Sequence, residues 1–120
     1  MLSTELADLV QEALDDLKAK DIKTIDVRHL TAVTDFMIIA SGRSDRHVRA
    51  LADGVLKRCK AVQCHPLGVE GESGGEWVLL DLGDVVVHVM LPRIREFYNL
   101  ERLWEIEARR EPQSASSVPR

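Results

Sequence analysis

Three aspartates have the side-chain type that suits catalysis. Asp81 and Asp84 flank a predicted tight turn at Gly83, and Asp35 lies in an apolar segment, so the three carboxylates could converge as in metal-dependent phosphoryl transfer. Aspartate is also common in turns, because its carboxylate accepts hydrogen bonds from nearby backbone N–H groups. The turn role is the favoured interpretation, and we expect no catalytic carboxylate cluster.

A second set of side chains is of the types that bind zinc: Cys59, Cys64, His65 and His88. The two cysteines are five residues apart and no second paired motif accompanies them, whereas zinc ligands usually occur in more closely spaced pairs. Cys59 also fits the apolar stripe of a predicted helix. We therefore expect neither a metal nor a cofactor.

The segment from Ser41 to Ser44 joins a predicted strand to a predicted helix, where backbone N–H groups can receive an anion. It lacks the glycine pattern of a dinucleotide-binding loop and the Lys-Ser or Lys-Thr pair of a phosphate loop. An ordinary strand-to-helix turn is favoured, with Ser44 as the helix N-cap and His47 on a solvated face.

The side chains that suit partner binding lie in one stretch, residues 77–104, which predicts two strands, a tight turn and a helix. Alternation in the second strand separates an aliphatic face (Val85, Val87, Val89, Leu91) from a mixed face (Val86, His88, Met90). An aliphatic face suits contact with covering helices, and a mixed face can be offered to a partner. His88 is then either a neutral, hydrogen-bonded core residue or a contact on an uncovered part of the sheet.

The direction of Trp77 depends on the turn. A two-residue Leu82-Gly83 loop sets Trp77 opposite His88 but requires a positive φ at Leu82, which leucine resists. A three-residue loop from Asp81 to Gly83 places Trp77 beside Val87 instead. Both alternatives stay open. Tyr98 and Trp104 suit either helix packing or an interface, and packing is favoured for Trp104.

Hydrophobic periodicity predicts the elements that position these residues: helices over 4–20, 44–63 and from 93 onward with a break at Asn99, and strands over 24–27, 33–40, 67–71, 77–82 and 85–91. The apolar run within 33–40 indicates a strand in the sheet interior. The helical stripe after Pro92 includes Phe97 and Leu103 as packing residues. The order of elements predicts an α/β fold with a mixed β-sheet and flanking helices.

The chain has 120 residues, a formal net charge of -4 and a pI of about 5.5. Residues 1–110 are predicted to form one domain, and the polar, proline-containing residues 111–120 a disordered tail. No Lys/Arg-rich stripe is evident, which disfavours binding to a phosphate backbone and favours a basic protein partner. The N-terminus has neither secretory nor transit features and no membrane span is evident, so we expect cytoplasmic residence.

Three segments resemble the Iojap family of ribosome silencing factors: DFMIIASGRSDRHVRALA, GEWVLLDLGDVVVHVM and REFYNLERLW. The resemblance covers residues 6–107. It implies a mixed α/β fold distantly similar to nucleotidyltransferases but without enzymatic activity. The Gly-Ser and paired-carboxylate signature of active nucleotidyltransferases is not intact, since Ser41-Gly42 is reversed and followed by Arg43.

The resemblance also implies a function. Family members bind the large ribosomal subunit through ribosomal protein fourteen (uL14), with little direct RNA contact, and block joining of the small subunit when nutrients are short. They are also expected to form a homodimer when free, and the residues carried over as partner-binding are Trp77, Asp81, His88, Met90 and Tyr98. Two alternatives stay open: a nucleotidyltransferase-like enzyme acting on nucleotide or RNA, and an interaction module in ribosome assembly.

Overall fold

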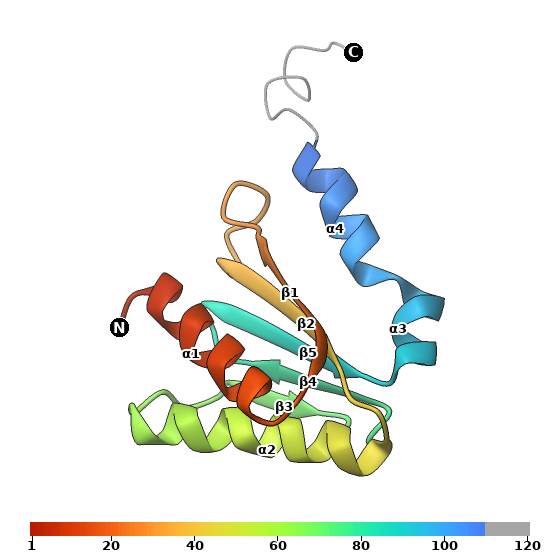
Figure 1. Ribbon diagram of the computed structural model, residues 1–120. Coiled ribbons are helices and arrows are strands. Elements are labelled where there is room, and N and C mark those ends of the chain that lie inside the picture. Colours follow the sequence, from red (N-terminus) through yellow and green to blue (C-terminus); the bar gives the residue numbers. More distant parts are fainter. Residues whose placement is uncertain (110–120) are drawn as a thin grey trace.

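A five-stranded sheet with strand order β1-β2-β5-β4-β3 forms the centre of the molecule (Figure 1). The computed structural model describes residues 1–109, so the disordered tail expected at 111–120 lies outside the described residues. Strands β2 and β5 pair in parallel and the other neighbours are antiparallel, which confirms the predicted mixed sheet. The strands are β1 (Lys20–Asp26), β2 (Phe36–Ser41), β3 (Gly68–Glu70), β4 (Trp77–Asp81) and β5 (Val85–Met90).

Among the described residues, four helices lie on the two faces of this sheet: α1 (Ser3–Asp16), α2 (Asp45–Ala61), α3 (Pro92–Tyr98) and α4 (Leu100–Arg109). Helices α1 and α2 lie side by side on one face, and α3 and α4 lie beyond the other (Figure 1). Within residues 1–109, no helix combines the length and the apolar character that a membrane crossing requires.

Helix α2 begins where the sequence predicts. The Ser44 hydroxyl accepts a hydrogen bond from the backbone N–H of His47 at 3.1 Å, as expected of an N-cap. Helix α1 ends earlier than predicted, and Lys18 beyond it has φ +67. The chain then enters β1 at Lys20, before the predicted start, because the edge strand extends along β2 past an irregularity between Lys20 and Lys23.

The face toward α1 and α2 carries the aliphatic core. Val85, Val87 and Val89 of β5 are fully buried there, together with Val78 and Leu80 of β4. All six residues of β2 are buried, which confirms the predicted interior strand. The alternation of β5 therefore separates its two faces as the sequence indicates.

The β4–β5 turn differs from both predicted loops. Asp81 pairs with Val86, and the Leu82 N–H donates to the Val85 carbonyl at 2.9 Å, so the connection is a two-residue Gly83-Asp84 loop. Gly83 has φ +89 and Asp84 has a negative φ, the pattern of a type II′ turn, in which glycine takes the first central position. This register places Trp77 opposite Met90, on the mixed face.

Candidate functional site

The mixed face of the sheet is covered only in part. Ile94 of α3 and Leu100 and Trp104 of α4 pack against an apolar cluster of buried residues, Ile25, Val27, Met37, Ile39 and Met90. This confirms the packing role of Trp104. Over β4, Trp77 and Leu79 remain half-buried.

Trp77 and His88 are joined across β4 and β5. The indole Nε1–H donates to Nδ1 of His88 at 3.0 Å, and the ring centroids are 5.9 Å apart. His88 is 8% exposed, and its burial lowers the pKa of the imidazole from 6.5 to about 4. The ring is therefore neutral near pH 7, with its proton on Nε2, as the first of the two interpretations of His88 predicts, and its role as a partner contact stays a prediction.

Two aromatic side chains at the end of α3 extend this site outward. The Tyr98 ring lies 4.9 Å from that of Trp77, and the Phe97 ring meets Tyr98 edge-on at 4.9 Å. Tyr98 is 53% exposed and Phe97 78% exposed. We call Trp77, Tyr98 and Phe97 the aromatic row.

The predicted packing roles of Phe97 and Leu103 are wrong, since both side chains are exposed. Asn99 adopts a left-handed conformation, with φ 49 and ψ 51, and ends α3 there. The break expected at Asn99 is present, but it changes the chain direction, so one helical stripe cannot continue from α3 into α4. Sequence reasoning missed Phe97 as a surface residue for this reason.

Helix α3 has no buried residue, and the side chain of Arg95 ties it to the sheet. Arg95 Nη1 donates to the Ser41 hydroxyl at 2.9 Å, and Nε donates to Glu101 of α4 at 2.9 Å. The Arg95 side chain is 11% exposed and that of Glu101 20%. Sequence reasoning missed this bridge, because no spacing rule relates three residues on β2, α3 and α4.

The remaining predicted contact residues have different surroundings. Met90 is fully buried beneath α3 and α4, so it can contribute to a surface only through the side chains it supports. Asp81 is half-buried, and its Oδ1 accepts the Gly83 N–H at 2.9 Å. That contact is the turn role favoured for this aspartate.

No cluster of metal-ligating side chains is found among residues 1–109. Asp35 and Asp84 interact through the backbone, where the Asp35 N–H donates to the Asp84 carbonyl at 2.9 Å. Cys59 is buried, and burial raises the pKa of its thiol to about 12. In the described part of the chain, no three Asp, Glu, His or Cys side chains are grouped to hold a metal ion.

The backbone donors of the strand-to-helix turn are already used. The Gly42 N–H donates to the Met90 carbonyl at 3.0 Å, and the Arg43 N–H donates to Nδ1 of His47 at 3.0 Å. Nε2 of His47 donates to the Leu17 carbonyl at 2.8 Å. His47 is only 8% exposed, so the expectation of a solvated His47 is wrong: its ring joins the start of α2 to the end of α1.

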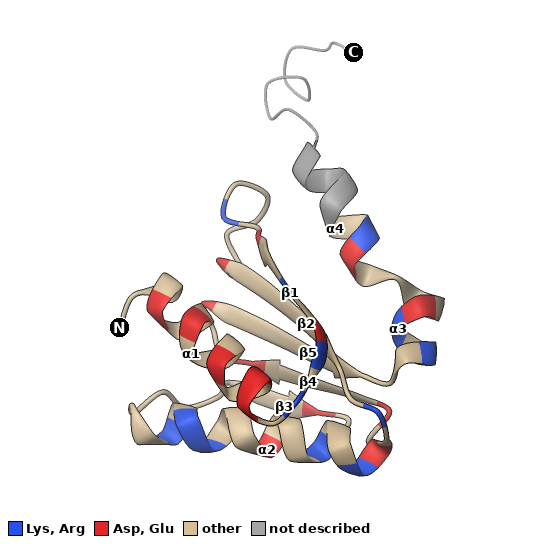
Figure 2. Ribbon diagram, viewed as in Figure 1, with Lys and Arg blue, Asp and Glu red and all other residues tan. Residues whose placement is uncertain are grey.

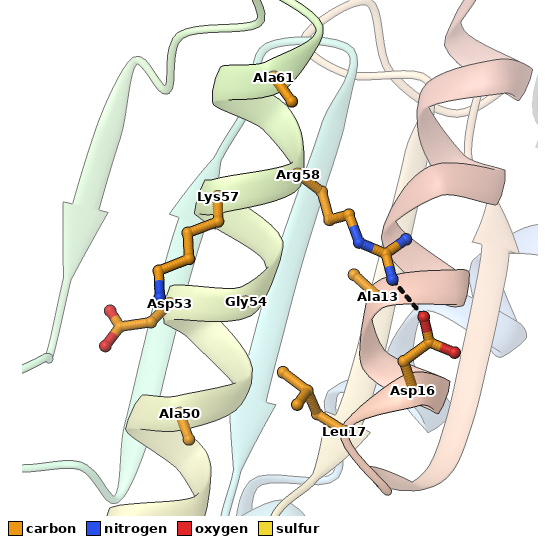
Figure 3. Close-up of a pocket in the computed structure, with 9 residues that line it drawn as sticks. All are labelled: Ala13, Asp16, Leu17, Ala50, Asp53, Gly54, Lys57, Arg58 and Ala61. Atoms are coloured by element: carbon orange, nitrogen blue, oxygen red, sulfur yellow. Dashed lines mark hydrogen bonds and ion pairs between the residues drawn. The ribbon is translucent and has the colours of Figure 1, made fainter.

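A hollow of about 540 Å³ lies between α1 and α2 (Figure 3). Ala13, Ala50, Gly54 and Ala61 line it, and Arg58 forms an ion pair with Asp16 at its rim. Its described lining residues include Lys57 and two aspartates but no Ser, Cys, His or Tyr.

Charges on the helical layer are segregated, with α1 acidic and α2 mainly basic (Figure 2). Two of the α2 cations are paired: Arg49 with Asp45 at 3.6 Å, and Arg58 with Glu12 at 3.6 Å as well as with Asp16. This layer covers the sheet face opposite the aromatic row.

Comparisons with known proteins agree on one family. The family described as "Ribosomal silencing factor during starvation" matches residues 2–119. A Chromobacterium violaceum protein named ribosomal silencing factor RsfS is 49% identical over 100 residues, which cover 83% of this chain and 82% of the relative. A mouse protein named mitochondrial assembly of ribosomal large subunit protein 1 is 35% identical over 104 residues, covering 84% of this chain and 46% of the relative.

A solved structure agrees with this result. The crystal structure of a Chromobacterium violaceum protein is similar with a TM-score of 0.86 and 48% sequence identity, covering 88% of each chain.

Proposed function

The chain belongs to the RsfS family of ribosomal silencing factors, and on this premise we propose that it binds the large ribosomal subunit through ribosomal protein fourteen. Bound there, it blocks joining of the small subunit and represses translation when nutrients are limited. Steric exclusion requires occupancy of the joining surface and no catalytic residue.

The observation that carries this proposal is the aromatic row, which runs from Trp77 on the partly covered sheet face to the exposed Tyr98 and Phe97 of α3. Tyrosine and tryptophan combine a large apolar body with a polar group and are enriched at the energetic centres of interfaces. With the Tyr98 ring tilted against that of Trp77 and Phe97 beyond it, the row offers a continuous apolar contact surface. The net charge of -4 complements a basic ribosomal protein.

The five predicted partner-binding residues divide into two groups in this proposal. Trp77, Asp81 and Tyr98 keep exposed surface and contact the partner. His88 and Met90 act from beneath, His88 through its hydrogen bond to the indole and Met90 through its place opposite Trp77. Little direct RNA contact is required.

We further propose that the chain works in the cytoplasm and that the free protein forms a homodimer through the aromatic row. Aromatic rings exposed to this degree favour burial against a second copy when no other partner is present. Self-association and subunit binding then compete for one surface, so added large subunits should dissociate the dimer.

One alternative function is favoured by a specific observation. The mouse relative carries ribosome large-subunit assembly in its name, which suits a module that acts before the subunit is mature. Binding to immature particles alone would support that alternative. The nucleotidyltransferase-like enzyme gains no support, because the backbone donors at Gly42 and Arg43 are already bonded.

The test is co-sedimentation with purified bacterial large ribosomal subunits, followed by addition of small subunits. The parent should bind the large subunit and lower the fraction of joined ribosomes, whereas Trp77→Ala should do neither. Val33→Ala is the matched control, because Val33 is 84% exposed in a loop outside the aromatic row. A parent chain that ignores the large subunit overturns the proposal. Met90→Lys is unsuitable as a probe, since it places a charge in the core.

A further inference from the structure

A small hollow opens on the mixed face between β3, β4 and β5, next to the aromatic row. It measures about 180 Å³ and is lined by Glu70, Gly71, Trp77, Leu79 and His88. We propose that this hollow is a socket for one apolar side chain that the partner presents beside a Lys or Arg. This inference rests on the proposed function and specifies the chemistry of the partner at that surface.

The register of three strands builds the socket. Leu79 of β4 lies opposite His88 of β5 on one side and opposite Glu70 of β3 on the other. Residues directly opposite one another in antiparallel strands share a face of the sheet, so these side chains surround one spot. Ile94, Leu100 and Trp104 of α3 and α4 pack instead over the cluster that contains Met37, Ile39 and Met90.

Two features keep the socket open. The hydrogen bond from the Trp77 indole to His88 fixes the indole as one wall, so the ring is held in place beside the hollow. Gly71 also lines the hollow: it has φ +87, and a Cβ at that position would lie 2.0 Å from the Trp77 carbonyl oxygen. The chain therefore approaches Trp77 closely at Gly71 without a side chain to fill the space.

Size decides the class of occupant. Pockets for small molecules usually enclose about 300–1,000 Å³. At about 180 Å³ the socket is too small for a nucleotide and suits a single side chain. Its lining combines an aliphatic side chain, an indole and a neutral imidazole, an environment that favours an apolar group.

The charged residues around the socket indicate which partner residue lies beside the apolar side chain. Glu70 is exposed at the rim, and Asp81 lies two residues beyond Leu79 on the same face of β4. Among the residues that line the socket there is no Lys or Arg to neutralise these carboxylates. A partner cation beside the apolar side chain complements them, as expected for a basic ribosomal protein.

The experiment measures binding of purified ribosomal protein fourteen to two kinds of variant. One substitution fills the socket, and another removes the negative charge at its rim. Leu79→Trp should occupy the space and weaken binding at least tenfold, whereas Val33→Trp should bind as the parent does. Val33 is the matched control because it is 84% exposed and does not line the socket. Glu70→Gln should weaken binding about threefold and reduce its dependence on salt, whereas Asp8→Asn on α1 should leave both unchanged.

Circular dichroism melts establish that each variant is folded. A further measurement on the parent protein tests the socket without any substitution. With Leu79 methyl groups isotopically labelled, bound protein fourteen should give intermolecular magnetisation transfer from an apolar side chain to these methyls. If the parent binds but Leu79→Trp and Glu70→Gln bind equally well, or no transfer to Leu79 is seen, the socket is overturned and the proposed function stands. If the parent fails to bind, both are overturned.

Discussion

The indole of Trp77 donates its only N–H to Nδ1 of His88, 3.0 Å away, on the neighbouring strand. This bond exists only while Nδ1 carries no proton, because a protonated imidazole has no acceptor. The orientation of a half-exposed aromatic ring thus depends on the protonation state of a buried histidine.

That dependence predicts how stability changes with pH. The pKa of His88 is about 4 in the folded protein and about 6.5 when the chain is unfolded. Between these values the unfolded state binds more protons, so the stability present above pH 6.5 is lost as the pH falls toward 4. From pH 7 to pH 5 the loss should be about 2 kcal/mol.

Urea denaturation of the parent at these two pH values measures this loss. His88→Gln provides the control, because its amide oxygen can still accept the indole N–H but does not titrate. An equal change in the parent and in His88→Gln between pH 7 and pH 5 would show that His88 is not the titrating group.

Phe97, at the exposed end of the aromatic row, should contribute to binding of the large ribosomal subunit but little to the stability of the fold. Phe97→Ala should reduce affinity for the large ribosomal subunit by about 1–2 kcal/mol, since truncation of an interface aromatic commonly costs that much. Its free energy of unfolding should change by less than about 0.5 kcal/mol, because the side chain is 78% exposed. Titrated co-sedimentation and urea melts measure the two quantities, and a variant that unfolds readily while still binding would contradict the assignment.

Removal of the Arg95 bridge should loosen α3 and α4 from the sheet. Arg95→Ala leaves the Ser41 hydroxyl and the Glu101 carboxylate without the guanidinium, at a cost of about 1–3 kcal/mol for groups that are mostly buried. Hydrogen exchange should accelerate in residues 92–104 more than in β2 or β5. In a double-mutant cycle, Arg95→Ala and Glu101→Ala should be non-additive. Additive effects would argue that the two side chains act independently.

The close approach of the chain at Gly71 gives a prediction with a built-in control. Gly71→Ala should destabilise the protein by about 1–3 kcal/mol, because alanine resists φ +87 and its Cβ collides with the Trp77 carbonyl oxygen. Gly74→Ala should be nearly neutral, since a Cβ there meets no atom within 4 Å. Thermal or urea denaturation of the two variants side by side decides the matter, and equal stabilities would contradict the predicted collision.

Short-range sequence patterns were enough to predict much of the fold. The periodicity of residues 85–90 separated the buried valines from the mixed face, Ser44 was recognised as an N-cap, and the run after Asp35 was recognised as an interior strand. These features depend on residues within a few positions of each other, where sequence spacing corresponds directly to geometry. The resemblance to the silencing factor family was likewise visible from residues in order along the chain.

Other features were decided by tertiary contacts. A shift of one residue in the β4–β5 turn would move Trp77 to the other face, and pairing of the whole hairpin selected Gly83-Asp84 as the loop. The left-handed Asn99 ended α3 and changed the direction of the chain, and Arg95 bonded to Ser41, 54 residues earlier in the chain. His47, expected in solvent, was buried against the end of α1.

The sequence by itself therefore determined the type and order of the helices and strands, which face of β5 is buried, and the family. Only the tertiary structure decided that Trp77 faces His88, that Met90 is hidden, and that a small hollow remains between β3, β4 and β5. The physical reason is the separation along the sequence of the residues that interact. Helix caps and alternation arise from neighbouring residues, whereas register, burial and the coverage of a sheet face arise from segments far apart in the chain.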